Sequence, residues 1–162
     1  METWINEDRM KIEDGYGSFS LERVRFINEK IGVSLPLLFI EMMKDNDGGF
    51  PEKNIFSFQD VRKNKVRLKC IGSFLSFNEN QYGDILETYL DPPEFFPKGL
   101  VAFGEDGGGD FICFDYREGK DNPNPPIVYW SHEANEGEDV SFIAKDFETF
   151  IGMLKSEDEL DK

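Results

Sequence analysis

The sequence predicts a single domain of the α+β class, with a mainly antiparallel central sheet packed by N-terminal helices and a C-terminal helix. Helical patterns fall mainly in residues 1–49 and after residue 145, whereas β-prone runs predominate in between. Short turns join most of these runs, which favours antiparallel pairing over parallel strands with helical crossovers. A chain of 162 residues with 16 Phe can bury one core without staples.

The N-terminal part predicts helices. Trp4 and Ile5 begin a short segment that the turn at 15–17 ends. Ser20 is a suitable N-cap for the next helix, and Gly32 fits the position just past its end. Apolar residues recur at helical spacing between these two positions: Leu21, Val24, Ile27 and Ile31.

A second helix is predicted to open at Leu35-Pro36, because proline is tolerated at the first helical position. Glu41 is the only polar residue from 37 to 43, so the sequence predicts a helix buried on most sides. The run Asp45-Asn46-Asp47-Gly48-Gly49 ends it.

The middle of the chain predicts strands, and its centre is a hairpin over residues 100–116. The expected strands are 55–58, 66–77, 100–103, 111–116, 127–130 and 140–144. Residues 80–90 suit a short helix. Asp146 is expected to cap a last helix, and 156–162 to form a charged, frayed tail, which places the core at about 19–154 of the domain 1–162.

The connection inside the hairpin, residues 104–110, combines glycines with Glu105, Asp106 and Asp110. Its structural interpretation is a turn held by aspartate side chains, and its functional interpretation is a binding loop. It lacks the Gly-Lys-Ser/Thr of a phosphate loop and the ligand spacing of an EF-hand. A weakly held Ca²⁺ or Mg²⁺ on Asp106 and Asp110, or a hydrolase that uses both carboxylates, remains open.

The composition is strongly acidic, with 33 Asp and Glu, 18 Lys and Arg, and a formal charge of −15. Nucleic acids and anionic membranes carry the same sign, so the charge opposes both as partners and favours a basic protein partner or simple solubility. The sequence has no 18-residue apolar run, and its N-terminus lacks the basic region of a signal peptide. We therefore expect a cytoplasmic protein.

Few residues suit metal or nucleophilic chemistry. Cys70 and Cys113 lie in apolar, strand-like runs and are expected to be reduced core residues. The single histidine, His132, is expected on the surface of an acidic loop, and a neighbouring serine in sequence does not make it a catalytic base. No cofactor or resident metal is predicted.

An ordered set of short strings resembles the SUKH superfamily, in the branch named for a yeast regulator of cell-wall synthesis. The strings are Phe19 to Val24, Ile31 to Pro36, Asp45 to Gly49, Phe103 to Asp110, Phe114-Asp115, Pro126 to Trp130 and Ala144 to Phe150. The resemblance implies an α+β fold and a protein that is not an enzyme. It also implies that the chain is an immunity protein, which binds and neutralises a cognate polymorphic or contact-dependent toxin, often a nuclease.

The expected partner is a basic toxin domain, met by an acidic surface on a monomer or weak dimer. The candidate contacts are loop carboxylates and neighbouring aromatics: Glu105, Asp106, Asp110, Glu133, Glu136, Glu138, Asp139, Tyr116, Tyr129 and Trp130. The carboxylates could equally form a solvated face, and core packing is the alternative for Trp130. A regulatory interaction scaffold is the alternative function.

Overall fold

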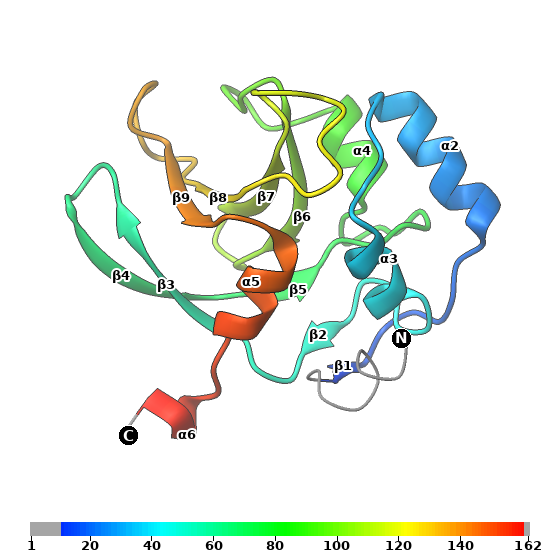
Figure 1. Ribbon diagram of the computed structural model, residues 1–162, viewed down its shortest axis with the longest axis horizontal. Coiled ribbons are helices and arrows are strands. Elements are labelled where there is room, and N and C mark those ends of the chain that lie inside the picture. The colour runs from blue at the N-terminus through cyan, green and yellow to red at the C-terminus, as the bar shows by residue number, and fades with distance from the viewer. Residues whose placement is uncertain (1–10, 161–162) are drawn as a thin grey trace.

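The computed structural model describes residues 11–160, and it confirms the α+β class (Figure 1). The expected helical segment that begins at Trp4 lies mostly outside the described residues, and its described end is a short strand, not a helix. The helices are α2 (Leu21–Ile31), α3 (Leu37–Met43), α4 (Ile85–Leu90), α5 (Phe147–Met153) and α6 (Glu157–Leu160). The strands are β1 (Ile12–Glu13), β2 (Phe50–Pro51), β3 (Ile55–Asp60), β4 (Lys65–Cys70), β5 (Ser73–Phe74), β6 (Leu100–Glu105), β7 (Phe111–Asp115), β8 (Ile127–Trp130) and β9 (Val140–Ala144).

The central sheet has five antiparallel strands in the order β5-β6-β7-β8-β9. Its middle is the predicted hairpin, in which Leu100 pairs with Asp115 and Glu105 pairs with Phe111. A register shift between Ala102 and Gly104 leaves the intervening residue, Phe103, outside the ladder. The Phe103 side chain is fully buried in the core.

One face of this sheet carries an aromatic core that fixes α3 and α5. Phe39 of α3 contacts the rings of Phe103, Phe114 and Phe147 at centroid distances of 5.5, 5.3 and 5.4 Å, all in edge-to-face geometry. Phe103 and Phe114 stack on each other at 4.1 Å. Edge-to-face and offset pairs add to the free energy of burial, so these rings hold both short helices against the sheet.

β3 and β4 form a separate hairpin beside β9, and it packs on the same face of the central sheet as the aromatic core (Figure 1). Phe56 and Phe58 of β3 pack against the ring of Tyr129 in β8, with centroids 6.2 and 4.7 Å away. The Val61 backbone N–H donates to Ser141 Oγ of β9 at 3.0 Å. The hairpin is therefore attached by side-chain packing and single hydrogen bonds, without a strand ladder to the central sheet.

The expected single strand 66–77 is wrong, because the chain changes sheets within it. β4 ends at Cys70, and the Gly72 backbone N–H then donates to the Glu105 carbonyl of β6 at 2.6 Å. β5 follows as a member of the central sheet. Periodicity along the sequence does not reveal which sheet a strand joins, so this break was not predictable from pattern alone.

The helices follow the predicted caps, with corrections to α3 and to the helix expected over 80–90. α2 has its N-cap at Ser20, whose Oγ accepts from the Arg23 N–H at 3.0 Å, and ends at Gly32 with a φ of +87°. α3 begins at Leu37, with Pro36 as its N-cap. It is not buried on most sides, because Leu37 is 79 % exposed and only one side of this short helix faces the sheet. The helix expected over 80–90 is confined to α4.

A further correction concerns the tail, which is not frayed over its described part. Residues 157–160 form α6. The Ser156 N–H donates to Glu159 Oε1 at 2.9 Å, and Lys53 Nζ lies 3.2 Å from Glu159 Oε2. These contacts hold a short helical turn next to the start of β3.

The structure also tests the expectation that both cysteines are core residues and the expectation that the chain has no membrane-spanning helix. Cys113 is a free, buried thiol as predicted, but Cys70 is exposed because it lies on the outer face of the β3-β4 hairpin. The prediction of a core position for Cys70 is therefore wrong. Within residues 11–160, no helix combines the length and the apolar composition that crossing a bilayer requires.

Candidate functional site

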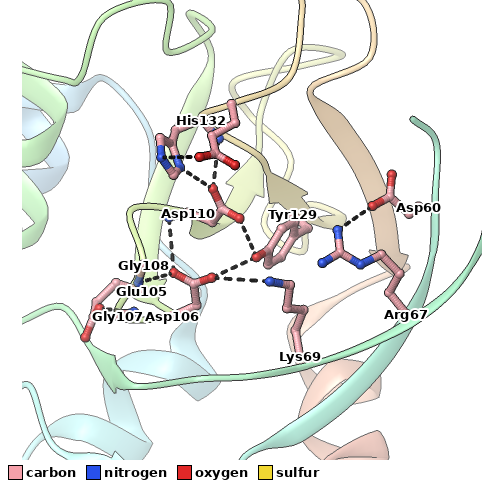
Figure 2. Close-up of polar contacts among 11 residues, drawn as sticks. Asp60, Arg67, Lys69, Glu105, Asp106, Gly107, Gly108, Asp110, Tyr129 and His132 are labelled. Atoms are coloured by element: carbon pink, nitrogen blue, oxygen red, sulfur yellow. Dashed lines mark hydrogen bonds and ion pairs between the residues drawn. The ribbon is translucent and has the colours of Figure 1, made fainter. Parts of the chain in front are cut away.

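The β6-β7 connection is a turn held by its own carboxylates (Figure 2). Asp106 Oδ1 accepts hydrogen bonds from the backbone N–H groups of Gly108 and Asp110, at 2.8 and 3.1 Å. Glu105 Oε1 accepts from the Gly107 N–H at 2.6 Å. Gly109 has a φ of +104°, which glycine adopts at little steric cost. Of the two interpretations of residues 104–110, this geometry matches the turn held by aspartate side chains.

The turn is anchored to β8 by the hydroxyl group of Tyr129. Tyr129 Oη lies 2.9 Å from Asp106 Oδ2 and 2.7 Å from Asp110 Oδ2. A phenol carries one proton, so it donates to one carboxylate at a time. Burial raises the pKa of Tyr129 far above its ordinary value, and the hydrogen bonds to the two aspartates raise it further. Tyr129 is therefore a neutral donor at any physiological pH.

His132, in the β8-β9 connection, extends this arrangement toward the surface. Asp110 Oδ1 lies 2.6 Å from His132 Nδ1 and accepts the His132 backbone N–H at 2.8 Å. The hydrogen bond to Asp110 raises the pKa of His132. Burial raises the pKa of Asp110, but hydrogen bonds from Tyr129 and His132 outweigh it, and the net pKa is lowered. The pair thus favours an imidazolium bound to a carboxylate.

Lys69 of β4 completes the group, which we call the Tyr129 cluster: Lys69, Asp106, Asp110, Tyr129 and His132. Lys69 Nζ lies 3.9 Å from Asp106 Oδ2 and 5.8 Å from the Tyr129 ring centroid. With His132 protonated, two cations balance two carboxylates across a neutral phenol. The cluster therefore joins β4, the β6-β7 turn, β8 and the start of the β8-β9 connection.

The cluster accounts for both oxygens of each aspartate. The Asp106 and Asp110 side chains are only 9 % and 14 % exposed. Each carboxylate oxygen faces a group of the protein itself, although Asp106 Oδ2 and Asp110 Oδ2 share the single proton of the Tyr129 hydroxyl group. Across residues 11–160, no three His, Cys, Asp or Glu side chains converge in a way that could hold a metal ion. The arrangement is suited to bracing the fold.

The three aromatic candidates lie in the core, which corrects the expectation that they sit at a contact surface. Tyr116, Tyr129 and Trp130 are at most 3 % exposed. The Tyr116 hydroxyl donates to the Ser34 carbonyl at 3.2 Å, and Trp130 Nε1 donates to Asp139 Oδ2 at 3.2 Å. Both polar groups are satisfied internally, so the core alternative for Trp130 is confirmed.

The remaining acidic candidates separate into an outward and an inward group. We call residues 131–139 the acidic loop. Glu133, Glu136 and Glu138 are exposed on it, and the Glu133 side chain is 78 % exposed. Asp139 is buried at its base, where the Ser131 N–H also donates to the Asp139 carbonyl at 2.8 Å. The loop thus holds three carboxylates toward solvent on a fixed base.

The basic residues of β4 and the ion pair between Arg67 and Asp60 were not singled out from the sequence. Asp60 is buried, and its carboxylate accepts from the Arg67 guanidinium at 2.8 Å and from the Arg62 N–H at 2.8 Å. Burial raises the pKa of Asp60, but the Arg67 hydrogen bond and the turn N–H groups outweigh it and lower the pKa overall. The alternation of Lys65, Arg67 and Lys69 with apolar residues was the available signal, since it places the basic side chains on one face of β4.

The sequence profile described as the SMI1 / KNR4 family (SUKH-1) matches residues 19–153. The chain is also similar to the SPbeta prophage-derived uncharacterized protein YokK of Bacillus subtilis (strain 168), at 32 % identity over 84 residues. That alignment covers 51 % of this chain and 39 % of the relative, so it spans well under half of the relative's length. Because the family match spans most of the chain, including the strings that suggested the resemblance, the chain belongs to the SMI1/KNR4 family (SUKH-1).

Proposed function

We propose that this protein is an immunity protein that acts in the cytoplasm as a monomer or weak dimer. It binds a cognate toxin with a basic surface, of the kind that a nuclease needs, and catalyses no reaction of its own. Membership of the SUKH-1 family supports this proposal, as does similarity to a protein named as prophage-derived. The formal charge of −15 is consistent with a basic partner.

The observation that carries the proposal is the acidic loop. Its three exposed glutamates, Glu133, Glu136 and Glu138, project from a base that Ser131, Trp130 and Asp139 hold by hydrogen bonds. A loop that is already ordered loses little conformational entropy on binding, so more of its electrostatic attraction appears as affinity.

The mechanism requires only occupancy of the toxin's functional surface. A nuclease must hold phosphate groups with Lys or Arg, so it presents a positive surface that attracts carboxylates. Complementary charge increases the rate of encounter, and a bound acidic loop then denies the substrate access. The Tyr129 cluster is consistent with a role without catalysis, because Asp106 and Asp110 are engaged by Tyr129, by His132 and by backbone N–H groups of the turn.

The test uses the toxin domain encoded beside the gene for this chain, produced together with it in cells. The wild-type chain should restore growth and co-purify with the toxin at low salt. Charge reversal at Glu133, Glu136 and Glu138 to lysine should abolish both, with an unchanged melting temperature. The matched control reverses three exposed glutamates elsewhere, Glu22, Glu29 and Glu94, and should still protect.

Two outcomes would contradict the proposal. If both triple variants protect equally, the acidic loop is not the contact surface. If the wild-type chain neither binds nor protects against the neighbouring toxin, the immunity function is wrong, and the regulatory scaffold becomes the better interpretation.

A further inference from the structure

The outer edge of β4 is an unpaired strand edge, and the backbone bonds show which of its groups are free. Ile55 exchanges both backbone hydrogen bonds with Lys155, at 3.0 and 2.9 Å, so its N–H and carbonyl point away from β4. Ile55 is opposite Cys70 in the β3-β4 ladder. Since bonding direction alternates along an antiparallel pair, the backbone groups of Val66 and Leu68 point away from β3.

This free edge has a defined end. At Gly72 the same outward direction is occupied, because the Gly72 N–H donates to the Glu105 carbonyl of β6. Between Lys65 and Cys70, no segment from residues 11–160 pairs with the outer side of β4. The edge therefore offers the N–H and carbonyl groups of Val66 and Leu68 to another strand.

The side chains along this edge suit an extended ligand. Val66 and Leu68 are 66 % and 58 % exposed and lie on the outer face of the hairpin. The charged side chains that alternate with them are directed inward, Arg67 to Asp60 and Lys69 to Asp106 (Figure 2). Charged side chains, including inward-pointing ones, are a common protection of strand edges. Here the charges of Arg67 and Lys69 are paired with Asp60 and Asp106, which leaves Lys65 as the β4 cation without a carboxylate partner within residues 11–160.

The basic charge of residues 62–69 indicates what kind of strand could pair with the outer edge of β4. Residues 62–69 contain five of the chain's 18 basic residues and no acidic one, although the whole chain carries −15. Pairing β4 with β4 of a second copy would place these basic residues opposite one another, and like charges on directly opposed strands are destabilising. A strand with carboxylates on its inner face would meet Lys65 favourably, and it would lie beside Arg67 and Lys69, which already face Asp60 and Asp106.

We propose that β4 binds an extended segment of another protein by strand addition, and that the segment alternates apolar residues with Asp or Glu. The apolar residues cover Val66 and Leu68, and the carboxylates lie beside the basic face of the strand. Backbone hydrogen bonds supply affinity, and the alternating side chains supply specificity. This surface is separate from the acidic loop, so each can be tested without the other.

The probe is a seven-residue peptide of alternating valine and glutamate, with threonine at both ends, titrated into the ¹⁵N-labelled full chain. Amide signals of residues 65–70 should shift on binding. Two control peptides should bind at least about tenfold more weakly, a loss of about 1.4 kcal/mol. One has lysine in place of glutamate, and the other is N-methylated at the amides that face β4.

Variants of the protein locate the site. Val66→Pro removes an outward N–H that the β3-β4 ladder does not use, and Leu68→Glu adds a repulsive charge; each should weaken binding about tenfold. Leu37→Lys, at a leucine on α3 that is more exposed than Leu68, should leave the affinity unchanged. The N-methylated peptide needs no protein variant, so the test survives if Val66→Pro fails to fold.

The proposal is overturned if the N-methylated peptide or the lysine peptide binds as tightly as the probe, or if the probe shifts no signal in β4. A concentration-dependent dimer that Leu68→Glu abolishes would assign the edge to a second copy, which also overturns it.

Discussion

Tyr129 shows how one buried hydroxyl group can organise segments that are distant in sequence. Its oxygen lies within 3 Å of carboxylates from two ends of the β6-β7 turn. Its ring supports Phe58 of β3 at 4.7 Å, and Lys69 lies over it. The residue is central both to the polar cluster and to the attachment of the β3-β4 hairpin.

Removing this hydroxyl group should reveal how much the cluster stabilises the fold. Tyr129→Phe keeps the ring but takes the shared donor from Asp106 and Asp110, which are both mostly buried. We expect a loss of about 1–3 kcal/mol in the free energy of unfolding, measured by urea denaturation. Tyr82→Phe, at an exposed tyrosine, is the control and should change stability very little. Equal stability of the two variants would show that the shared hydrogen bonds are not needed.

The His132–Asp110 pair should make stability depend on pH. The folded pKa of His132 is raised from 6.5, so its contribution is complete below that value and is lost as pH rises through the raised pKa. The folded pKa of Asp110 is lowered from 3.8, so its contribution is present above that value and is lost as pH falls through the lowered pKa. The pair therefore stabilises most between these two values. Glu133 and Asp106 also face the imidazole and act in the same direction.

His132→Ala should accordingly cost most near pH 5–6, by about 0.5–1 kcal/mol, and less at about pH 9. Urea denaturation of both proteins across this range measures the difference. In an Asp110→Asn background, the effect of His132→Ala should lose most of its pH dependence. A cost that is the same at both pH values would show that the imidazole acts through packing alone.

At the scale of elements, the β6-β7 turn depends on glycine at one position for two reasons. Gly109 has a φ of +104°, and a Cβ there would lie 2.9 Å from His132 Cε1. A side chain would be strained by its own backbone and would displace the imidazole from Asp110.

Gly109→Ala should therefore destabilise the protein by about 1–3 kcal/mol and reduce the pH dependence described above. Thermal unfolding at pH 6 and pH 9 measures both effects. Gly119→Ala is the matched control, because a Cβ at Gly119 meets nothing within 4 Å. If Gly109→Ala is as stable as this control, the turn tolerates a side chain and the packing of His132 on it is unimportant.

Charge governs behaviour at the scale of the whole molecule. The net charge of −15 is unevenly distributed, with exposed glutamates on the acidic loop and five basic residues within 62–69. Excess charge of one sign destabilises a compact state by self-repulsion, and salt screens that repulsion.

Raising NaCl from about 10 to about 150 mM, which shortens the Debye length from about 30 to about 8 Å, should therefore raise the melting temperature. KCl at the same ionic strength should act equally if screening is the cause. The surface pairs that salt weakens contribute little each, so they should not reverse the trend. A melting temperature that falls with salt would show that attractive pairs outweigh the net repulsion.

Local chemistry carried most of the fold prediction. The predicted N-caps Ser20 and Asp146 each accept a hydrogen bond within the first turn of their helix, and a capping side chain needs only neighbouring residues. The hairpin of β6 and β7 followed from two β-prone runs around a glycine-rich turn. The depth of α3, the change of sheet after Cys70 and the exposure of Cys70 did not follow, because each depends on which distant surface the segment meets.

The sequence by itself determined the α+β class, the order of α2, α3, α4 and α5 and of most strands of the central sheet, the acidic charge and the family resemblance, since these depend on local patterning, composition and ordered motifs. Only the tertiary structure decided the direction of each side chain. It turned Asp106 and Asp110 inward to Tyr129, buried Tyr116 and Trp130, and left Glu133, Glu136 and Glu138 in solvent. The reason is that burial and hydrogen bonding are settled by partners many residues away, such as Lys69 for Asp106, whose approach depends on how two sheets pack.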